Sequence, residues 1–104
     1  MVELTQAIVY KDLQKVHEIL KYVYGITDVI IEYPGFLSID YDGHEIHAGY
    51  CYDGDENTDG QKFHVYDFTD GVNDFSRVFD TNNDLRFVAR KIAQTINEYL
   101  KERN

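Results

Sequence analysis

Apolar residues near the start of the chain recur every three or four positions, which is the spacing of one face of an α-helix. The pattern predicts a helix over 11–24, and Gly25 is a typical residue for ending it. Residues 3–10 contain β-branched side chains that suit either a helix or a short strand, so both interpretations stay open there. The expected buried stripe consists of Val9, Leu13, Val16, Leu20 and Val23.

A second apolar stripe with helical spacing predicts another helix within 80–104. Thr81 and Asp84 have the spacing of a capping box at its start, and neighbouring Asp and Asn side chains would also serve as caps. The expected stripe consists of Leu85, Val88, Ile92, Ile96 and Tyr99.

The middle of the chain holds short runs of β-branched and aromatic residues, which favour β-strands. Consecutive strands with short connections form an antiparallel meander. We therefore predict one α+β domain over 1–104, with an N-terminal helix, a four-stranded antiparallel meander and a C-terminal helix, and with both helices on one face of the sheet. The strands are expected at 28–33, 36–41, 44–52 and 62–68, separated by Pro34-Gly35, Asp42-Gly43 and the loop 53–60.

The Asp42-Gly43 turn sets the expected register of the sheet. A two-residue turn pairs the residues that flank it, and a symmetric closure of the loop 53–60 would align the next two strands in the same way. The Pro34-Gly35 turn does not match a tight hairpin, so a bulge there is an alternative. Such a bulge would exchange the faces on which the residues of the first strand lie. The expected pairs are Tyr41 with His44, Ile39 with Ile46, Tyr50 with Phe63, and Ala48 with Val65.

Alternation along these strands gives the sheet two different faces. The first is apolar and is expected to lie under the helices; it contains Leu37, Ile39, Ile46, Ala48, Tyr50, Tyr52, Phe63 and Val65. The second is polar and aromatic, and we expect it to face solvent or a partner, because the helices cannot also cover it. It contains Phe36, Ser38, Asp40, Glu45, His47, Gly49, Cys51, Lys62, His64, Tyr66 and Phe68.

Length and composition agree with one domain. The 104 residues are 43% apolar and 14% aromatic, which is enough for a single core. Cys51 is the single cysteine and cannot form an internal disulfide, so a reducing, cytoplasmic setting is expected. The N-terminus lacks the basic start and long apolar run of a signal peptide, and no stretch has the length of a membrane span.

The net charge of −9 is regional. Residues 34–76 contain ten acidic side chains and one basic side chain, Lys62. An acidic surface repels nucleic acid and anionic membranes, so neither is expected as a direct ligand. The ten acids are Asp40, Asp42, Glu45, Asp53, Asp55, Glu56, Asp59, Asp67, Asp70 and Asp74.

The loop 53–60 alternates oxygen-bearing side chains, as calcium loops do. An EF-hand loop beginning at Asp53 needs Gly at its sixth position and Glu at its twelfth, whereas this sequence has Thr58 and His64 there. A polar hairpin tip is therefore the expected structure, and a calcium-binding loop remains an alternative.

His47, Cys51 and His64 share the second face in this register, and imidazole and thiolate are zinc ligands. Their spacing matches no zinc motif, and the acidic surroundings would not lower the pKa of a cysteine nucleophile. A metal-dependent or thiol enzyme on this face is the alternative function. We expect no catalytic residue, metal site or cofactor, because no catalytic motif is present.

These observations favour a non-enzymatic interaction module that docks a basic surface of a partner protein. Charge would steer the encounter, and aromatic side chains on the second face would supply affinity. A sharper version is an inhibitor that mimics the charge of nucleic acid on a nucleic-acid-binding protein; a homodimer through the same face is an alternative. The expected binding residues are Phe36, Asp40, Glu45, His47, Asp53, Asp55, Glu56, Asp59 and Tyr66.

Overall fold

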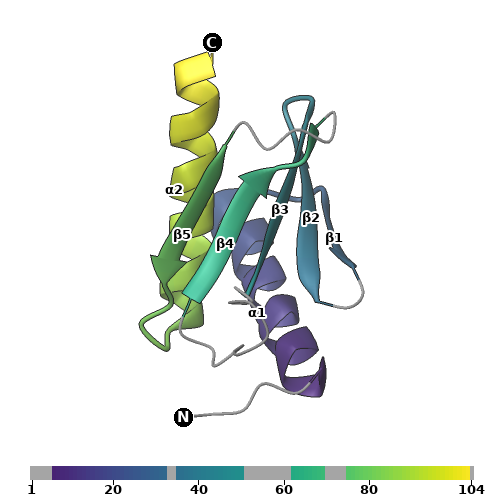
Figure 1. Ribbon diagram of the computed structural model, residues 1–104. Helices are drawn as coiled ribbons and strands as arrows, with labels where there is room; N and C mark the ends of the chain where they lie inside the picture. Colours follow the sequence, from purple (N-terminus) through teal and green to yellow (C-terminus); the bar gives the residue numbers. More distant parts are fainter. Residues whose placement is uncertain (1–5, 33–34, 51–61, 70–74, 104) are drawn as a thin grey trace.

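A computed structural model describes residues 6–32, 35–50, 62–69 and 75–103. It confirms the α+β fold: a helix at each end of the described chain, an antiparallel sheet between them, and both helices on the same side of that sheet (Figure 1). The elements are α1 (Gln6–Tyr24), β1 (Val29–Glu32), β2 (Phe36–Tyr41), β3 (His44–Tyr50), β4 (Lys62–Asp67), β5 (Ser76–Asp80) and α2 (Leu85–Arg103).

The sheet follows chain order, β1-β2-β3-β4-β5, and each neighbouring pair is antiparallel. Asp42 and Gly43 both have positive φ, at 53° and 83°, as a two-residue hairpin turn requires. The predicted register is confirmed at all four pairs: Tyr41 with His44, Ile39 with Ile46, Tyr50 with Phe63, and Ala48 with Val65.

The fifth strand, β5, was not predicted. Phe79 and Arg77 pair with Phe63 and Val65 of β4, so these two β5 residues lie on the helix side. Arg77 there is exposed and lies over the Phe75 ring, with its Cζ 4.7 Å from the ring centroid. A charged residue on the inner side and exposed Val78 on the outer side break the apolar alternation that signals a strand. An edge strand tolerates this pattern because only one of its edges is paired.

Both helices have identifiable ends. Gly25 has φ 70° and the Ile26 amide donates to the Leu20 carbonyl at 2.9 Å, which ends α1 as predicted. The start of α1 at Gln6 shows that 6–10 are helical, while 3–5 lie outside the described residues.

The start of α2 differs from the predicted capping box. Asn82 and Asn83 have φ of 54° and 52°, a left-handed conformation that a right-handed helix cannot include. The helix therefore begins after them, and Asp84 caps it by accepting from the Arg86 amide at 3.0 Å.

The core lies between the helices and the sheet face they cover. Leu37, Ile39 and Phe63 are fully buried, and so are Leu13, Val16 and Leu20 of α1 and Val88, Ile92 and Ile96 of α2. Val23 was expected in the buried stripe of α1 but is 67% exposed, because it lies in the last turn of the helix. Tyrosine–aspartate hydrogen bonds of 2.6 Å add polar links: Tyr50 of β3 donates to Asp12 of α1, and Tyr99 of α2 donates to Asp67 of β4. The predicted covered residues described as buried are Leu37, Ile39, Ile46, Ala48, Tyr50, Phe63 and Val65; Tyr52 lies outside the described residues.

Candidate functional site on the open sheet face

The side of the sheet opposite the helices, which we call the open face, is covered by neither α1 nor α2 (Figure 1). The strand register arranges its side chains in a grid. The register places Asp40 opposite Glu45, Ser38 opposite His47, and Phe36 opposite Gly49. The described members of the open face are Ile30, Glu32, Phe36, Ser38, Asp40, Glu45, His47, Gly49, Lys62, His64, Tyr66, Phe68, Ser76, Val78 and Asp80.

At the centre of this face lies an aromatic–histidine cluster of Phe36, His47, His64, Tyr66 and Phe68. The His47 ring stacks on Phe68, with centroids 4.5 Å apart and planes at 15°, and it contacts Phe36 at 4.7 Å. The Tyr66 ring meets the His47 ring edge-on, with centroids 5.4 Å apart. On its other side the cluster is extended by His64, whose ring centroid lies 4.7 Å from that of Tyr66. Although no helix covers it, His47 is only 6% exposed.

Gly49 makes the approach of Phe36 to His47 feasible. A Cβ on Gly49 would lie 3.0 Å from the Cβ of Phe36 and 3.1 Å from the Gly35 carbonyl oxygen, closer than ordinary contact. The missing side chain lets Phe36 lie across β3 toward His47. A strand glycine with an aromatic packed over it is a known device for pinning strand register.

Both nitrogens of His47 have polar partners. Nε2 lies 2.6 Å from Glu45 Oε2, and a carboxylate only accepts, so Nε2 carries the proton and donates. Nδ1 lies 3.3 Å from the Tyr66 hydroxyl, which donates to it when the imidazole is neutral. The ring is therefore fixed in orientation by two hydrogen bonds and by the aromatic side chains around it.

His64 and Tyr66 form the second half of the cluster. His64 Nε2 lies 2.6 Å from the Ser76 hydroxyl of β5. Partial burial lowers the pKa of His64 and raises the pKa of Tyr66, since burial disfavours the charged form of each group. Both groups are accordingly neutral near pH 7, so this half of the cluster presents uncharged rings.

A separate polar network lies where β3 and β4 meet α2. The buried Asp67 carboxylate accepts from the Tyr99 hydroxyl at 2.6 Å, from the Thr69 amide at 2.8 Å and from His44 Nδ1 at 3.0 Å. Burial acts to raise the pKa of Asp67, but these bonds, those from Thr69 and Tyr99 first, outweigh it and lower the pKa from 3.8 to about 2. The network fastens α2 to the sheet.

This network supplies a partner that the sequence did not reveal. His44 lies beside the hairpin turn and had no evident partner, because Asp67 is distant in sequence and reaches it only once β3 and β4 pair. A His–Asp pair of this kind resembles part of a catalytic triad, but Asp67 is also committed to Tyr99 and Thr69. The pairing of His44 with Asp67 is explained by its structural role, which is to hold α2 against the sheet.

Five of the predicted binding residues lie on the open face. Phe36, His47 and Tyr66 are in mutual contact through His47, and Glu45 binds His47 directly. Asp40 pairs with Glu45 across the hairpin and is exposed. The strand alternation in the sequence placed Phe68 and His64 on this face, but they were not counted among the predicted binding residues. Their position in that alternation was the signal that could have identified them. The predicted residues Asp53, Asp55, Glu56 and Asp59 lie outside the described residues.

The alternative metal site is not assembled by the residues that the structure describes. His47 is bonded to Glu45 and Tyr66, and His64 to Ser76, while Cys51 lies outside the described ranges. Within those ranges, no group of three histidine, cysteine or acidic side chains is placed to hold a metal ion. The calcium alternative concerns the loop 53–60, which also lies outside them.

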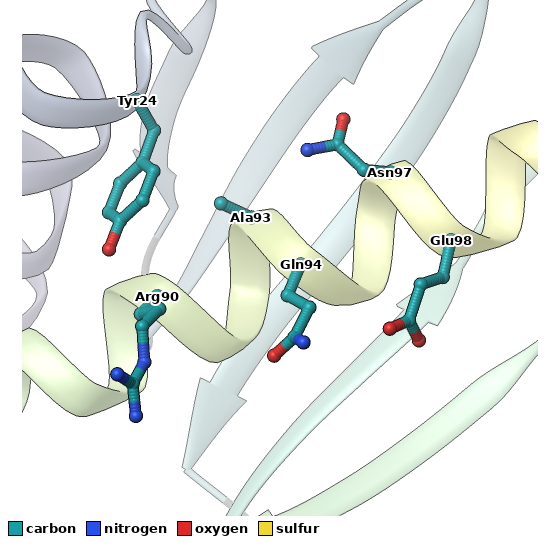
Figure 2. A pocket seen from close by; sticks show the side chains of 6 residues that line it. All are labelled: Tyr24, Arg90, Ala93, Gln94, Asn97 and Glu98. Carbon is teal, nitrogen blue, oxygen red and sulfur yellow. The ribbon is translucent and has the colours of Figure 1, made fainter.

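A groove of about 600 Å³ lies between the C-terminal end of α1 and one side of α2. Figure 2 shows the Tyr24 ring extending from α1 toward α2 near Arg90. The groove is open and its lining mixes a cation, an anion and two amides, a combination that does not single out one ligand class. The open face is therefore the stronger candidate. The lining residues are Tyr24, Arg90, Ala93, Gln94, Asn97 and Glu98.

No family model, curated protein or solved structure matches this chain. Among the described residues, neither helix has an apolar stretch long enough to cross a membrane.

Proposed function

We propose that this chain is a non-enzymatic interaction module whose open face docks a basic surface of a partner protein. The observation that carries the proposal is the aromatic–histidine cluster at the centre of a sheet face that neither helix covers. Its rings are held by hydrogen bonds and by one another before any partner arrives. Preorganised aromatic side chains lose little conformational entropy on binding, which makes them effective anchors.

Charge supports a basic partner. On the described part of the open face, Lys62 is the one Lys or Arg side chain. The acids there are Glu32, Asp40, Glu45 and Asp80, and the middle of the sequence carries the net charge of −9. A negative surface accelerates the approach of a basic partner and disfavours acidic ones.

A sharper form of the proposal makes the partner a nucleic-acid-binding protein. Carboxylates spread over a sheet face and an adjoining acidic loop would then take the place of backbone phosphates in a basic groove. The property that tests this form is competition: the chain should displace duplex DNA or RNA from such a protein, and its own binding to that protein should weaken as salt increases.

The test of the docking surface uses a 12-residue peptide containing both Lys and Arg. Backbone NMR shifts should change on β2, β3 and β4, and affinity should fall with added salt. Asp40→Lys should weaken binding several-fold. The matched control is Glu18→Lys, which reverses an exposed acid on α1, far from the open face, and should change affinity little.

Rate measurements separate steering from anchoring. Reversing Asp53, Asp55, Glu56 and Asp59 to Lys should slow association and reduce its salt dependence. Tyr66→Ala or Phe36→Ala should speed dissociation, at a cost of about 1–3 kcal/mol.

Two outcomes would contradict the proposal. The first is peptide-induced shifts confined to the helices. The second is a chain that dimerises by sedimentation and becomes monomeric with Tyr66→Ala, which would make the open face a homodimer seam.

A further inference from the structure

The ring stack on the open face ends at Phe68, which is the accessible end of the cluster. Phe36, His47 and Phe68 lie on a diagonal across the sheet, so the His47 ring is enclosed between the two phenyl rings. His47 is 6% exposed, whereas Phe68 is 45% exposed. The Phe68 ring is thus presented to solvent, with the His47 ring stacked behind it.

Carboxylates lie beside this exposed ring. The Phe68 amide donates to the Glu45 carbonyl at 2.8 Å, which places Glu45 directly across from it, and Asp40 pairs with Glu45 on the next strand. Glu45 uses Oε2 for His47, and its side chain remains 45% exposed. The row Asp40, Glu45, Phe68 therefore combines two accessible carboxylates with an open aromatic ring.

Other aromatic rings of this chain already carry a cation of their own. Arg77 lies over Phe75, Arg90 over Phe87, and Lys21 lies 5.2 Å from the Tyr22 ring centroid. In the described part of the chain, no Lys or Arg occupies that position over Phe68. Phe68 therefore has acidic neighbours, Glu45 and Asp40, that favour a cation over its ring, but no Lys or Arg of the described residues supplies one.

We infer that the group this row accepts is a guanidinium, the side chain of an arginine on the partner. The inference rests on the proposed function and specifies its chemistry. A guanidinium is planar, so it can stack on Phe68 while its in-plane N–H groups donate to Glu45 and Asp40. A lysine ammonium is a compact point charge that pairs with the carboxylates but does not extend the stack.

The experiment compares two small probes, N-acetyl-arginine amide and N-acetyl-lysine amide, titrated into the full chain and followed by NMR. The arginine probe should shift the Glu45, His47 and Phe68 signals and bind roughly two- to fivefold more tightly than the lysine probe. Phe68→Leu keeps an apolar side chain and should remove this preference. Glu45→Gln should weaken both probes.

Tyr22→Leu is the control, because it removes an exposed aromatic ring from α1 and should leave the preference unchanged. Equal affinity for the two probes, or arginine-induced shifts away from the row, would overturn the inference.

The failures of the inference and of the docking proposal are distinguishable. If the basic peptide still binds the open face but replacing its Arg residues by Lys has no effect, only the guanidinium inference fails. If neither probe nor the basic peptide shifts the open face, both fail.

Discussion

The two faces of the sheet bury their side chains by different means. On the covered face, residues such as Leu37 and Ile46 are fully buried because two helices lie over them. On the open face, His47 is nearly as buried although no helix is above it, because Phe36, Tyr66 and Phe68 surround it from neighbouring strands. Side chains on the covered face are buried by the helical layer, whereas His47 on the open face is buried by neighbouring side chains of the sheet itself.

This difference separates stability from recognition. Removing atoms from the covered face opens a cavity between two layers, which costs unfolding free energy. A partner that covers the open face would find side chains already fixed in position. The contrast implies that substitutions on the two faces should have effects of different size and kind.

The largest effect should come from the covered face. Leu37→Ala removes a fully buried side chain between the sheet and the helices and should lower the free energy of unfolding by about 2–5 kcal/mol. Ser38→Ala, one residue along the same strand but on the open face, should change it by less than about 0.5 kcal/mol. Urea unfolding of the two variants makes the comparison, and similar losses would remove the distinction between the faces.

Asp67 should make stability depend on acid. Its pKa falls from an ordinary value of 3.8 to about 2 in the folded chain, so its contribution is complete above 3.8 and is lost as the pH falls toward 2. The contribution is on the order of 2 kcal/mol. Asp67→Asn should be less stable than the parent at pH 6 by about this amount, and the gap should narrow near pH 2. A gap that is constant with pH would contradict this assignment.

Gly49→Ala should disturb the open face more than the core. The added Cβ would meet Phe36 at 3.0 Å, so Phe36 has to move away from His47, at a cost of about 1–3 kcal/mol. The His47 ring signals in NMR should shift while those of the core residue Val65 change little. Unchanged His47 signals would show that the contact of Phe36 with His47 does not depend on this glycine.

The smallest effect should come from His64. Burial lowers its pKa below the ordinary 6.5, so the unfolded chain binds the proton more tightly than the folded chain. The contribution of neutral His64 to the free energy of unfolding is therefore complete above pH 6.5 and declines as the pH falls below that value. An NMR titration of the ring should give a midpoint below 6.5, and His64→Gln should remove this share of the pH dependence. A midpoint above 6.5 would contradict the prediction.

Local rules were sufficient for most of the fold. The Asp42-Gly43 turn determined the β2–β3 register, and apolar alternation then assigned residues to the two faces. Strand β5 was not predicted because its alternation is reversed. The charged Arg77 lies on the helix side and the apolar Val78 lies on the open face, whereas a half-buried strand has apolar residues on the covered side. Its position depends on pairing with β4, which is a tertiary contact and leaves little trace in a short sequence window.

The candidate site was predictable only in part. Strand parity placed Phe36, His47 and Tyr66 on one face, but it could not show that Phe36 would cross over Gly49 to reach His47. That contact depends on rotamers and on the diagonal direction between strands. The pairing of His44 with Asp67 was hidden for a similar reason, because it joins residues 23 positions apart.

The order of the strands also bears on how the chain folds. Every strand pairs with its neighbour in sequence, so the sheet can grow one hairpin at a time with short loop closures. The contact between α1 and α2 joins segments from the two ends of the described chain and closes the longest loop. We therefore expect a low-contact-order sheet to form early, with docking of the two helices against each other completing the folding reaction.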